Sequence, residues 1–196
     1  PRKNIMNFCG SPLISWSIKQ ALKSKFISSV WVSSDDHEIL ECSKTFGANI
    51  ILRPHNISGD KASSESAWIH ALEEIQKNQK VDLIVGLQAT SPLRGKNDID
   101  LSVKNYIENN LDSLFSVVEI EDFFTWVIDK KSKRPKSTNY DYKNRKRRQD
   151  IEKKYLENGS IYVFDPRMLL ATKNRIHGNI GFHIMEKYKM FQIDNH

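Results

Sequence analysis

The chain has 196 residues, of which 39% are hydrophobic and 28% charged, as is typical of one globular domain with a sizeable core. Its apolar runs are too short to cross a bilayer, so we expect neither a membrane span nor a leader. Residue 1 is proline, and we expect the native start to precede it. Cys9 and Cys42 lack metal-ligand spacing, which favours free thiols in a reducing cytoplasm.

The net charge of +6 comes from one segment. Residues 131–154 contain eleven Lys or Arg and three acidic residues, whereas the remainder contains 19 basic and 21 acidic residues. The body of the chain is therefore near neutral. A basic run such as 143–148 is compatible with a nucleic-acid patch, but no nucleic-acid module accompanies it. We favour a solvated arm over nucleic-acid binding.

Helices and strands are predicted to alternate along the first 118 residues, from the spacing of apolar residues and from capping residues such as Asp35 or Asp36. The predicted elements are a helix over 12–25, a strand over 28–34, a helix over 36–44, a strand over 50–52, a helix over 63–75, a strand over 81–88, a helix over 98–109 and a strand over 114–118. This alternation predicts an α/β fold with a doubly wound, mostly parallel sheet.

The alternation stops over 119–156, where aromatic residues precede the basic run. It resumes with a strand over 160–164, a helix from Pro166, and short strands over 182–185 and 191–193. We therefore expect one domain over 1–196, with 119–156 as an excursion within it.

A polar segment, LQATSPLR at 87–94, ends the strand predicted over 81–88. Open α/β sheets bind ligands at the carboxyl edge of their strands, and proline cannot continue a central strand. Gln88 offers an amide, and Ser91 and Arg94 suit hydroxyl and anion contacts. By itself the segment is also compatible with an ordinary capped turn between a strand and a helix.

This segment closely resembles the LQ(P/A)TSPLR signature of the cytidylyltransferases that make CMP-sialic acid and related CMP-nonulosonic acids. Four further blocks resemble the family in the same order, namely PRKNI at 1–5, RP with GDKASS within 53–64, RQ with YLENGSIY within 148–162, and QID at 192–194. The resemblance implies a nucleotide-diphospho-sugar-transferase-like, Rossmann-like fold. It also implies that a nine-carbon 2-keto sugar acid attacks the α-phosphate of CTP and releases pyrophosphate.

The resemblance implies a nucleotide site with residues from two of these blocks. Lys3 and Asn4 match the end of the family's glycine-rich phosphate loop, where Lys3 would stabilise phosphate charge. Arg53, the backbone of Ala62 and the hydroxyl of Ser64 would read cytosine, which presents acceptors beside an amino donor. The simpler alternatives are a solvated basic terminus and an ordinary helix cap.

The same resemblance implies a sugar-acid site formed by Gln88, Arg148, Asn158 and Tyr162. Lys3 and Gln88 are the expected catalytic residues. Arginine and tyrosine suit a carboxylate and hydroxyls, although the Asn-Gly pair alone is a turn signal and the tyrosine alone is a common strand residue. In the family, pseudaminic-acid enzymes carry a different sequence here, so we favour a sialic or legionaminic acid. CMP-Kdo synthesis fits this block less well.

Asp194 matches one of two aspartates with which the family holds Mg²⁺ (or Mn²⁺) beside the triphosphate, and Gln192 replaces the other. Mg²⁺ suits few carboxylates together with phosphate oxygens and water, so we expect Asp194 as the metal ligand. The replacement leaves a catalytically impaired nucleotide-binding remnant as an alternative.

In the family, the excursion packs against a second subunit and lends residues to its active site. Phe123, Phe124 and Trp126 could anchor such an interface. We therefore expect a cytoplasmic homodimer that binds CTP and a sugar acid, in the synthesis of cell-surface polysaccharides.

Overall fold

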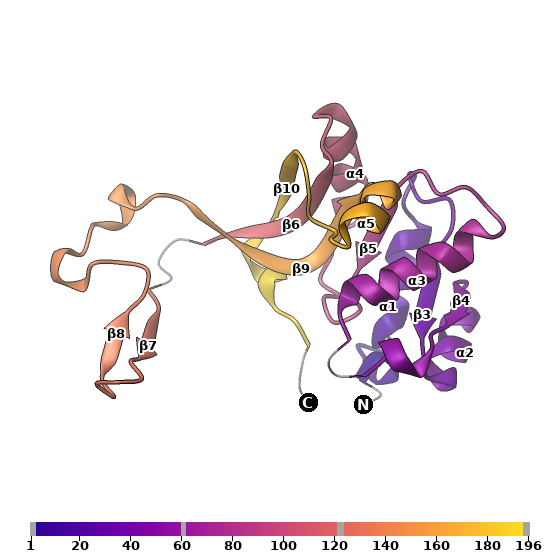
Figure 1. The fold of residues 1–196 in the computed structure, drawn as a ribbon, viewed down its shortest axis with the longest axis horizontal. Coiled ribbons are helices and arrows are strands. Elements are labelled where there is room, and N and C mark those ends of the chain that lie inside the picture. Colours follow the sequence, from indigo (N-terminus) through magenta and orange to yellow (C-terminus); the bar gives the residue numbers. More distant parts are fainter. Residues whose placement is uncertain (1–2, 60–61, 121–123, 194–196) are drawn as a thin grey trace.

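The computed structural model describes residues 3–59, 62–120 and 124–193, which form an α/β body and a thin arm that projects from it (Figure 1). The helices are α1 (Leu13–Leu22), α2 (His37–Thr45), α3 (Ser64–Gln76), α4 (Asp98–Glu108) and α5 (Pro166–Thr172). The strands are β1 (Asn7–Phe8), β2 (Ser11–Pro12), β3 (Trp31–Ser34), β4 (Asn49–Leu52), β5 (Ile84–Leu87), β6 (Ser113–Ile120), β7 (Trp126–Ile128), β8 (Pro135–Ser137), β9 (Lys154–Phe164) and β10 (Ile180–Met185). The short 3-10 helices are η1 (Lys3–Ile5), η2 (His55–Ile57), η3 (Tyr142–Asn144), η4 (Arg148–Asp150) and η5 (Lys187–Met190).

The main sheet has four strands in the order β10-β6-β9-β5. β10 runs parallel to β6, and β9 runs antiparallel to both β6 and β5. Three of the four strands therefore share one direction. β3 and β4 form a further parallel pair. The predicted α/β class with a mostly parallel sheet is confirmed.

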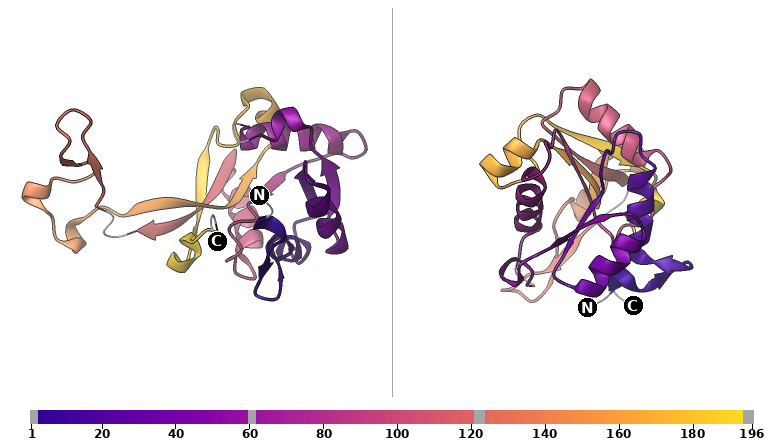
Figure 2. Two further views of the ribbon diagram at one scale, coloured as in Figure 1. Left: turned by 90° about the horizontal axis from the view of Figure 1, so that it is seen from below. Right: turned by 90° about the vertical axis from the view of Figure 1, so that its right-hand side faces the viewer.

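Helices cover both faces of this sheet, because residues of β9 alternate between two apolar cores. Ile161 and Val163 pack with Ala21 of α1 and with residues of α4. Tyr162 and Phe164 point to the opposite face, where they pack against α3 and α5. Figure 2 shows the helices on either side of the sheet. This is the doubly wound arrangement that the sequence predicts.

Local capping explains where the helices begin and end. Asp36 accepts hydrogen bonds from the amides of Glu38 and Ile39 and starts α2. Gly47, with φ +92°, follows the end of that helix. Ser63 caps α3 by accepting a bond from the Ser66 amide. These side chains could be read directly from the sequence.

Two strand predictions are corrected by the pairing. β9 begins at Lys154, six residues before the predicted start, because its first half pairs with the end of β6. The strand predicted over 191–193 is wrong. Those residues form no ladder, and Ile193 instead donates one bond to the Thr90 carbonyl (2.8 Å).

The arm grows from the ribbon that β6 and β9 form and ends in the β7–β8 hairpin (Figure 1). Its aromatic residues pack on one another, with ring centroids 4.2 Å apart for Phe124 and Tyr140 and 5.4 Å for Trp126 and Tyr142. Phe123, a third predicted anchor, lies outside the described residues. The arm therefore has a small aromatic cluster of its own.

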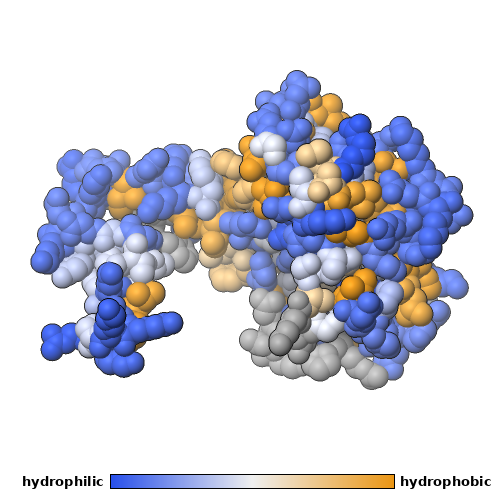
Figure 3. Space-filling view, viewed as in Figure 1, coloured by the Kyte–Doolittle hydropathy of each residue, from blue (hydrophilic) through white to orange (hydrophobic). Residues whose placement is uncertain are grey.

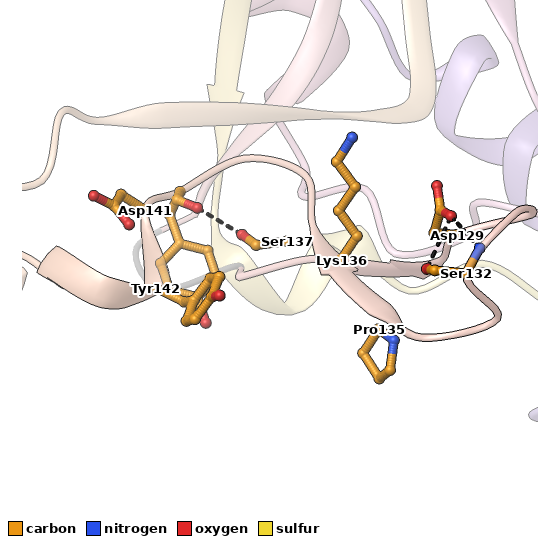
Figure 4. A pocket seen from close by; sticks show the side chains of 8 residues that line it. Asp129, Ser132, Pro135, Lys136, Ser137, Asp141 and Tyr142 are labelled. Carbon is orange, nitrogen blue, oxygen red and sulfur yellow. Dashed lines mark hydrogen bonds between the residues drawn. The ribbon is translucent and has the colours of Figure 1, made fainter.

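A hollow of about 410 Å³ lies on this arm, lined by residues such as Asp129, Lys136 and Tyr142 (Figure 4). None of the residues predicted for the site lines it. In the described part of the chain, no helix is both long and apolar enough to cross a membrane.

Candidate functional site

A bulge in β9 lies beside the carboxyl end of β5. Between two paired positions, Phe115 with Tyr162 and Val117 with Glu157, β6 advances two residues while β9 advances five. Ser116 of β6 stabilises the bulge, since its hydroxyl donates to Asn158 Oδ1 (2.6 Å) and accepts from the amide of Ile161 (2.8 Å). Bulges of this kind often redirect the chain near functional sites. Here residues 158–160 turn towards the loop that follows β5.

Arg94 ties that loop to the bulge. Its Nη2 donates to the carbonyls of Gln88 (2.6 Å) and Ser160 (2.8 Å), and its Nη1 donates to Ser17 Oγ of α1 (2.8 Å). The residue is only 7% exposed, and this burial lowers the pKa of Arg94 to about 9 against the opposing effect of the Asp98 carboxylate. The expected anion contact at Arg94 is therefore wrong, because the guanidinium is used inside the protein.

Three chain segments meet at Gly159. Its φ of +65° is a left-handed conformation, and a Cβ there would lie 2.8 Å from Gln88 Oε1 and 2.9 Å from Gln192 Nε2. Gln192 Nε2 also donates to the carbonyl of Asn158 (2.8 Å). The structure thus brings Gln88 and Gln192 together, which their separation in the sequence did not indicate. Asp194, the predicted metal ligand, lies outside the described residues.

Asn158 directly precedes Gly159, and Tyr162 follows three residues later in β9; both side chains are buried. Asn158 is 1% exposed, and its Nδ2 donates to the carbonyl of Lys189 (3.2 Å). Tyr162 is 2% exposed, and its hydroxyl donates to Glu157 Oε1 (2.6 Å). Burial and then this bond raise the pKa of Tyr162 to about 12, so its hydroxyl is neutral at physiological pH. Both side chains are bonded within the protein, and their contact with a ligand stays a prediction.

Arg53 follows β4, at the edge where β3 also ends. Its Nε donates to Ser58 Oγ (3.0 Å), and its Nη2 lies 3.7 Å from Asp35 Oδ1. About a quarter of the side chain is exposed, so the guanidinium edge can still meet a ligand. Ala62 and Ser64 are exposed. Ser63 caps the N-terminus of α3, so Ser64 is not needed as the capping residue.

Lys3 and Asn4 lie in η1, next to the loop after β5. Ile5 of η1 packs in one apolar cluster with Ile14, Ile18 and Ala89. Within the described residues, Asn4 Oδ1 is buried and has no hydrogen-bond partner. A buried acceptor without a donor is costly, which favours a ligand N–H or O–H at this point.

Arg148, the remaining predicted site residue, lies in η4 on the arm. The described residues contain no cluster of three or more His, Cys, Asp or Glu suited to a metal ion. Sequence reasoning misjudged one residue of this region and missed another. Arg94 was expected to contact a ligand. Lys189 was not singled out, because a lysine near other charged residues such as Glu186 and Lys187 is common on surfaces.

Comparison with known proteins places the whole chain in one family. The family model described as Cytidylyltransferase matches residues 1–195. A pseudaminic acid cytidylyltransferase of Campylobacter jejuni subsp. jejuni is 37% identical over 83% of this chain and 71% of its own length. An N-acylneuraminate cytidylyltransferase of Oncorhynchus mykiss is 36% identical over 84% of this chain and 38% of its own length.

Among solved structures, a CMP:2-keto-3-deoxy-manno-octonic acid synthetase complexed with CTP matches with a TM-score of 0.67 at 15% identity, over 94% of this chain and 83% of that one. At this identity the match concerns the fold. The bulge, the loop after β5 and the segment after η5 coincide with the sequence blocks of the resemblance. This chain belongs to the cytidylyltransferase family.

Proposed function

We propose that the chain transfers a cytidylyl group from CTP to a nonulosonic acid and releases pyrophosphate. The observation that carries the proposal is the meeting of Gln88, Gly159 and Gln192 at the carboxyl edge of the sheet. These residues come from three of the family's sequence blocks, and ligands bind at this edge in open α/β folds. The matched relatives named for pseudaminic acid and for N-acylneuraminate are almost equally similar to this chain. We therefore propose nonulosonic acids as the substrate class, which includes both sugars.

CTP would lie between η1 and the exposed turn before α3. Lys3 would offset phosphate charge, and the unpartnered Asn4 Oδ1 would accept a hydrogen bond from the nucleotide. Arg53, the backbone of Ala62 and the Ser64 hydroxyl would bind the cytosine edge. Preorganised donors of this kind accelerate phosphoryl transfer by positioning and by charge stabilisation.

The sugar acid would lie beside the bulge. The Gln88 amide would orient it, and Arg148 would bind its carboxylate. Asn158 and Tyr162 are bonded internally, so we assign them to shaping the bulge and the wall of this site.

A divalent cation, Mg²⁺ or Mn²⁺, would be held by Asp194 and the phosphates. Mg²⁺ uses one or two carboxylates plus phosphate oxygens, so the lack of a larger carboxylate cluster in the described residues fits this assignment. Ile193 is bonded to Thr90, which brings the chain before Asp194 to the loop after β5. When bound, the cation would supply charge neutralisation of the triphosphate.

Pyrophosphate release tests the proposed reaction. The full chain is assayed with CTP and, in separate reactions, sialic, legionaminic, pseudaminic and Kdo acids, with ATP, GTP and UTP as nucleotide controls. We expect turnover with CTP and a nine-carbon acid, and the sialic or legionaminic acid as the best substrate. Absence of turnover with every acid would contradict the proposed reaction. A preference for Kdo would show that the substrate is Kdo and not a nonulosonic acid.

We further propose a cytoplasmic homodimer in which the arm, residues 119–156, contacts the second copy. Ile180, Phe182 and Ile184 are 38–50% exposed on edge strand β10, and the Tyr155 ring of β9 packs 4.7 Å from Phe182. Figure 3 shows apolar surface where the arm leaves the body. Free Cys9 and Cys42 suit a reducing compartment. A partner would cover this apolar surface and receive Arg148.

Mixing two inactive variants tests this assembly. Gln88→Ala removes a residue of the body, and Arg148→Ala removes a residue of the arm. If the arm acts in the partner, mixed dimers contain one intact site and regain part of the turnover. Light scattering measures the oligomer, and a chain lacking residues 131–147 should be monomeric and inactive. A fully active monomer would overturn the proposal.

A further inference from the structure

A buried lysine lies behind the candidate site and is used by none of the roles above. Lys189 Nζ is only 2% exposed by its side chain and lies 2.8 Å from Asp98 Oδ2, at the start of α4. It also pairs with Glu186. A buried ammonium is costly unless it is paired in this way. Lys189 is therefore an internal ion-pair residue and not a surface charge.

Lys189 belongs to a cluster of charged and titratable groups around Asp98. Burial alone would raise the pKa of Asp98, but hydrogen bonds from His183, Lys189 and the Gly95 amide hold it at about 2. Burial alone would lower the pKa of Lys189, but Asp98 and Glu186 raise it. Both groups are charged at neutral pH, so the pair persists under working conditions.

The backbone of Lys189 and the residues after it reach the candidate site directly. The Lys189 carbonyl accepts from Asn158 Nδ2 (3.2 Å), inside the bulge of β9. Three residues later, Gln192 bonds to the Asn158 carbonyl, and Ile193 bonds to Thr90. The buried side chain of Lys189 thus holds residues 189–193, which contact both the bulge of β9 and the loop after β5.

We infer that Lys189 is a positioning residue for the proposed reaction, and this inference rests on the proposed function. Through its ion pair with Asp98, the Lys189 ammonium holds residues 186–193 against the loop and the helix start at 88–98. We call this ion pair the latch. The latch fixes Gln192 beside Gln88 and Gly159. Without it, the sugar-acid side of the site would lose its geometry while the nucleotide side, at η1 and Arg53, would keep its own.

The test separates positioning from simple loss of stability. Lys189→Met removes the latch but leaves the Asp98 charge buried. The double variant Lys189→Met/Asp98→Asn also removes that charge, and asparagine can still accept from the Gly95 amide. Lys187→Met, at an exposed position two residues away, is the matched control. Urea unfolding is measured alongside kcat and KM for CTP and for the sugar acid.

We expect the double variant to recover most of the stability lost by the single variant, yet to keep a KM for the sugar acid raised about tenfold, because small misplacements cost turnover steeply. KM for CTP should stay near that of the Lys187→Met control. A double variant with an unchanged KM for the sugar acid and unchanged kcat would overturn the inference. If neither Lys189 variant folds, Gly95→Ala replaces them, because its new methyl would lie 2.9 Å from Lys189 Nζ and displace the ammonium without removing any charge.

Hydrogen exchange distinguishes failure of the inference from failure of the proposed function. If the unmodified chain does not turn over CTP with any sugar acid, the proposed function fails and exchange alone decides the latch. The amide of Ile193 should then exchange faster in the double variant than in Lys187→Met, while amides of β9 stay protected. Equal exchange at Ile193 in both variants would overturn the latch.

Discussion

The two halves of the candidate site are built in different ways. The proposed sugar half, formed by residues 88–94, 157–160 and 189–193, is held together by buried side chains such as Arg94 and Lys189. The proposed nucleotide half, formed by η1, Arg53 and residues 62–64, consists of exposed or half-exposed residues. A substitution in the sugar half should therefore change folding and turnover together. A substitution in the nucleotide half should change binding with little effect on folding.

The largest expected effect is that of Arg94→Met, which removes the clamp of the sugar half. The carbonyls of Gln88 and Ser160 would lose their charged donor, so we expect a loss of about 3–5 kcal/mol in the free energy of unfolding. Urea denaturation measures it. Arg167→Met is the control, because that guanidinium is 87% exposed and an ion pair at the surface contributes little to stability. Equal stability of the two variants would contradict the clamp.

The next largest effect is expected for Gly159→Ala, which acts on geometry within the same half. The added methyl would meet both Gln88 and Gln192, so turnover should fall about a hundredfold. Gly10→Ala is the matched control, since Gly10 also has a positive φ (+84°) but has open space around it. Steady-state kinetics should show normal turnover for the control. Similar kinetics in both variants would remove Gly159 from the site.

In the nucleotide half, Arg53→Ala should weaken CTP binding by about 1–3 kcal/mol, the cost of a charged hydrogen bond left unmade. Unfolding should change little, because the side chain makes one hydrogen bond and one loose ion pair among the described residues. Calorimetric titration with CTP measures the affinity. His55→Ala, an exposed change beside the same Asp35, should bind CTP normally. A folded Arg53 variant with unchanged CTP affinity would contradict the cytosine assignment.

The smallest effect is expected for Gln192→Asp, near the end of the last segment of the sugar half. A new carboxylate two residues before Asp194 in the sequence should lower the Mg²⁺ concentration that gives half-maximal turnover. It also removes the amide that donates to Asn158, so the maximal rate should fall slightly. Gln192→Asn, which keeps the amide chemistry, separates the two effects. An unchanged metal dependence in the aspartate variant would place residue 192 outside the metal site.

Local sequence patterns predicted most of the body. Helix starts at Asp36 and Ser63 were readable because a capping side chain bonds to amides only two or three residues away. The α/β class followed from alternating periodicities, which reflect one buried face per element. The strand over 191–193 failed because an apolar, alternating triplet does not show whether a partner strand is available.

The sequence by itself determined the class of fold and, through its motifs, the resemblance to the cytidylyltransferases. Its proposal that the loop after β5 is a ligand-binding edge stays a prediction. Only the tertiary structure decided which of these side chains are buried and bonded inside the protein. Arg94 bonds to Ser160, 66 positions away, and Lys189 pairs with Asp98, 91 positions away. An arginine in a turn and a lysine in a charged run look available for ligands until the packing of distant segments buries them. Burial then demands internal partners, and so it converts candidate ligand-binding groups into the supports that hold the site.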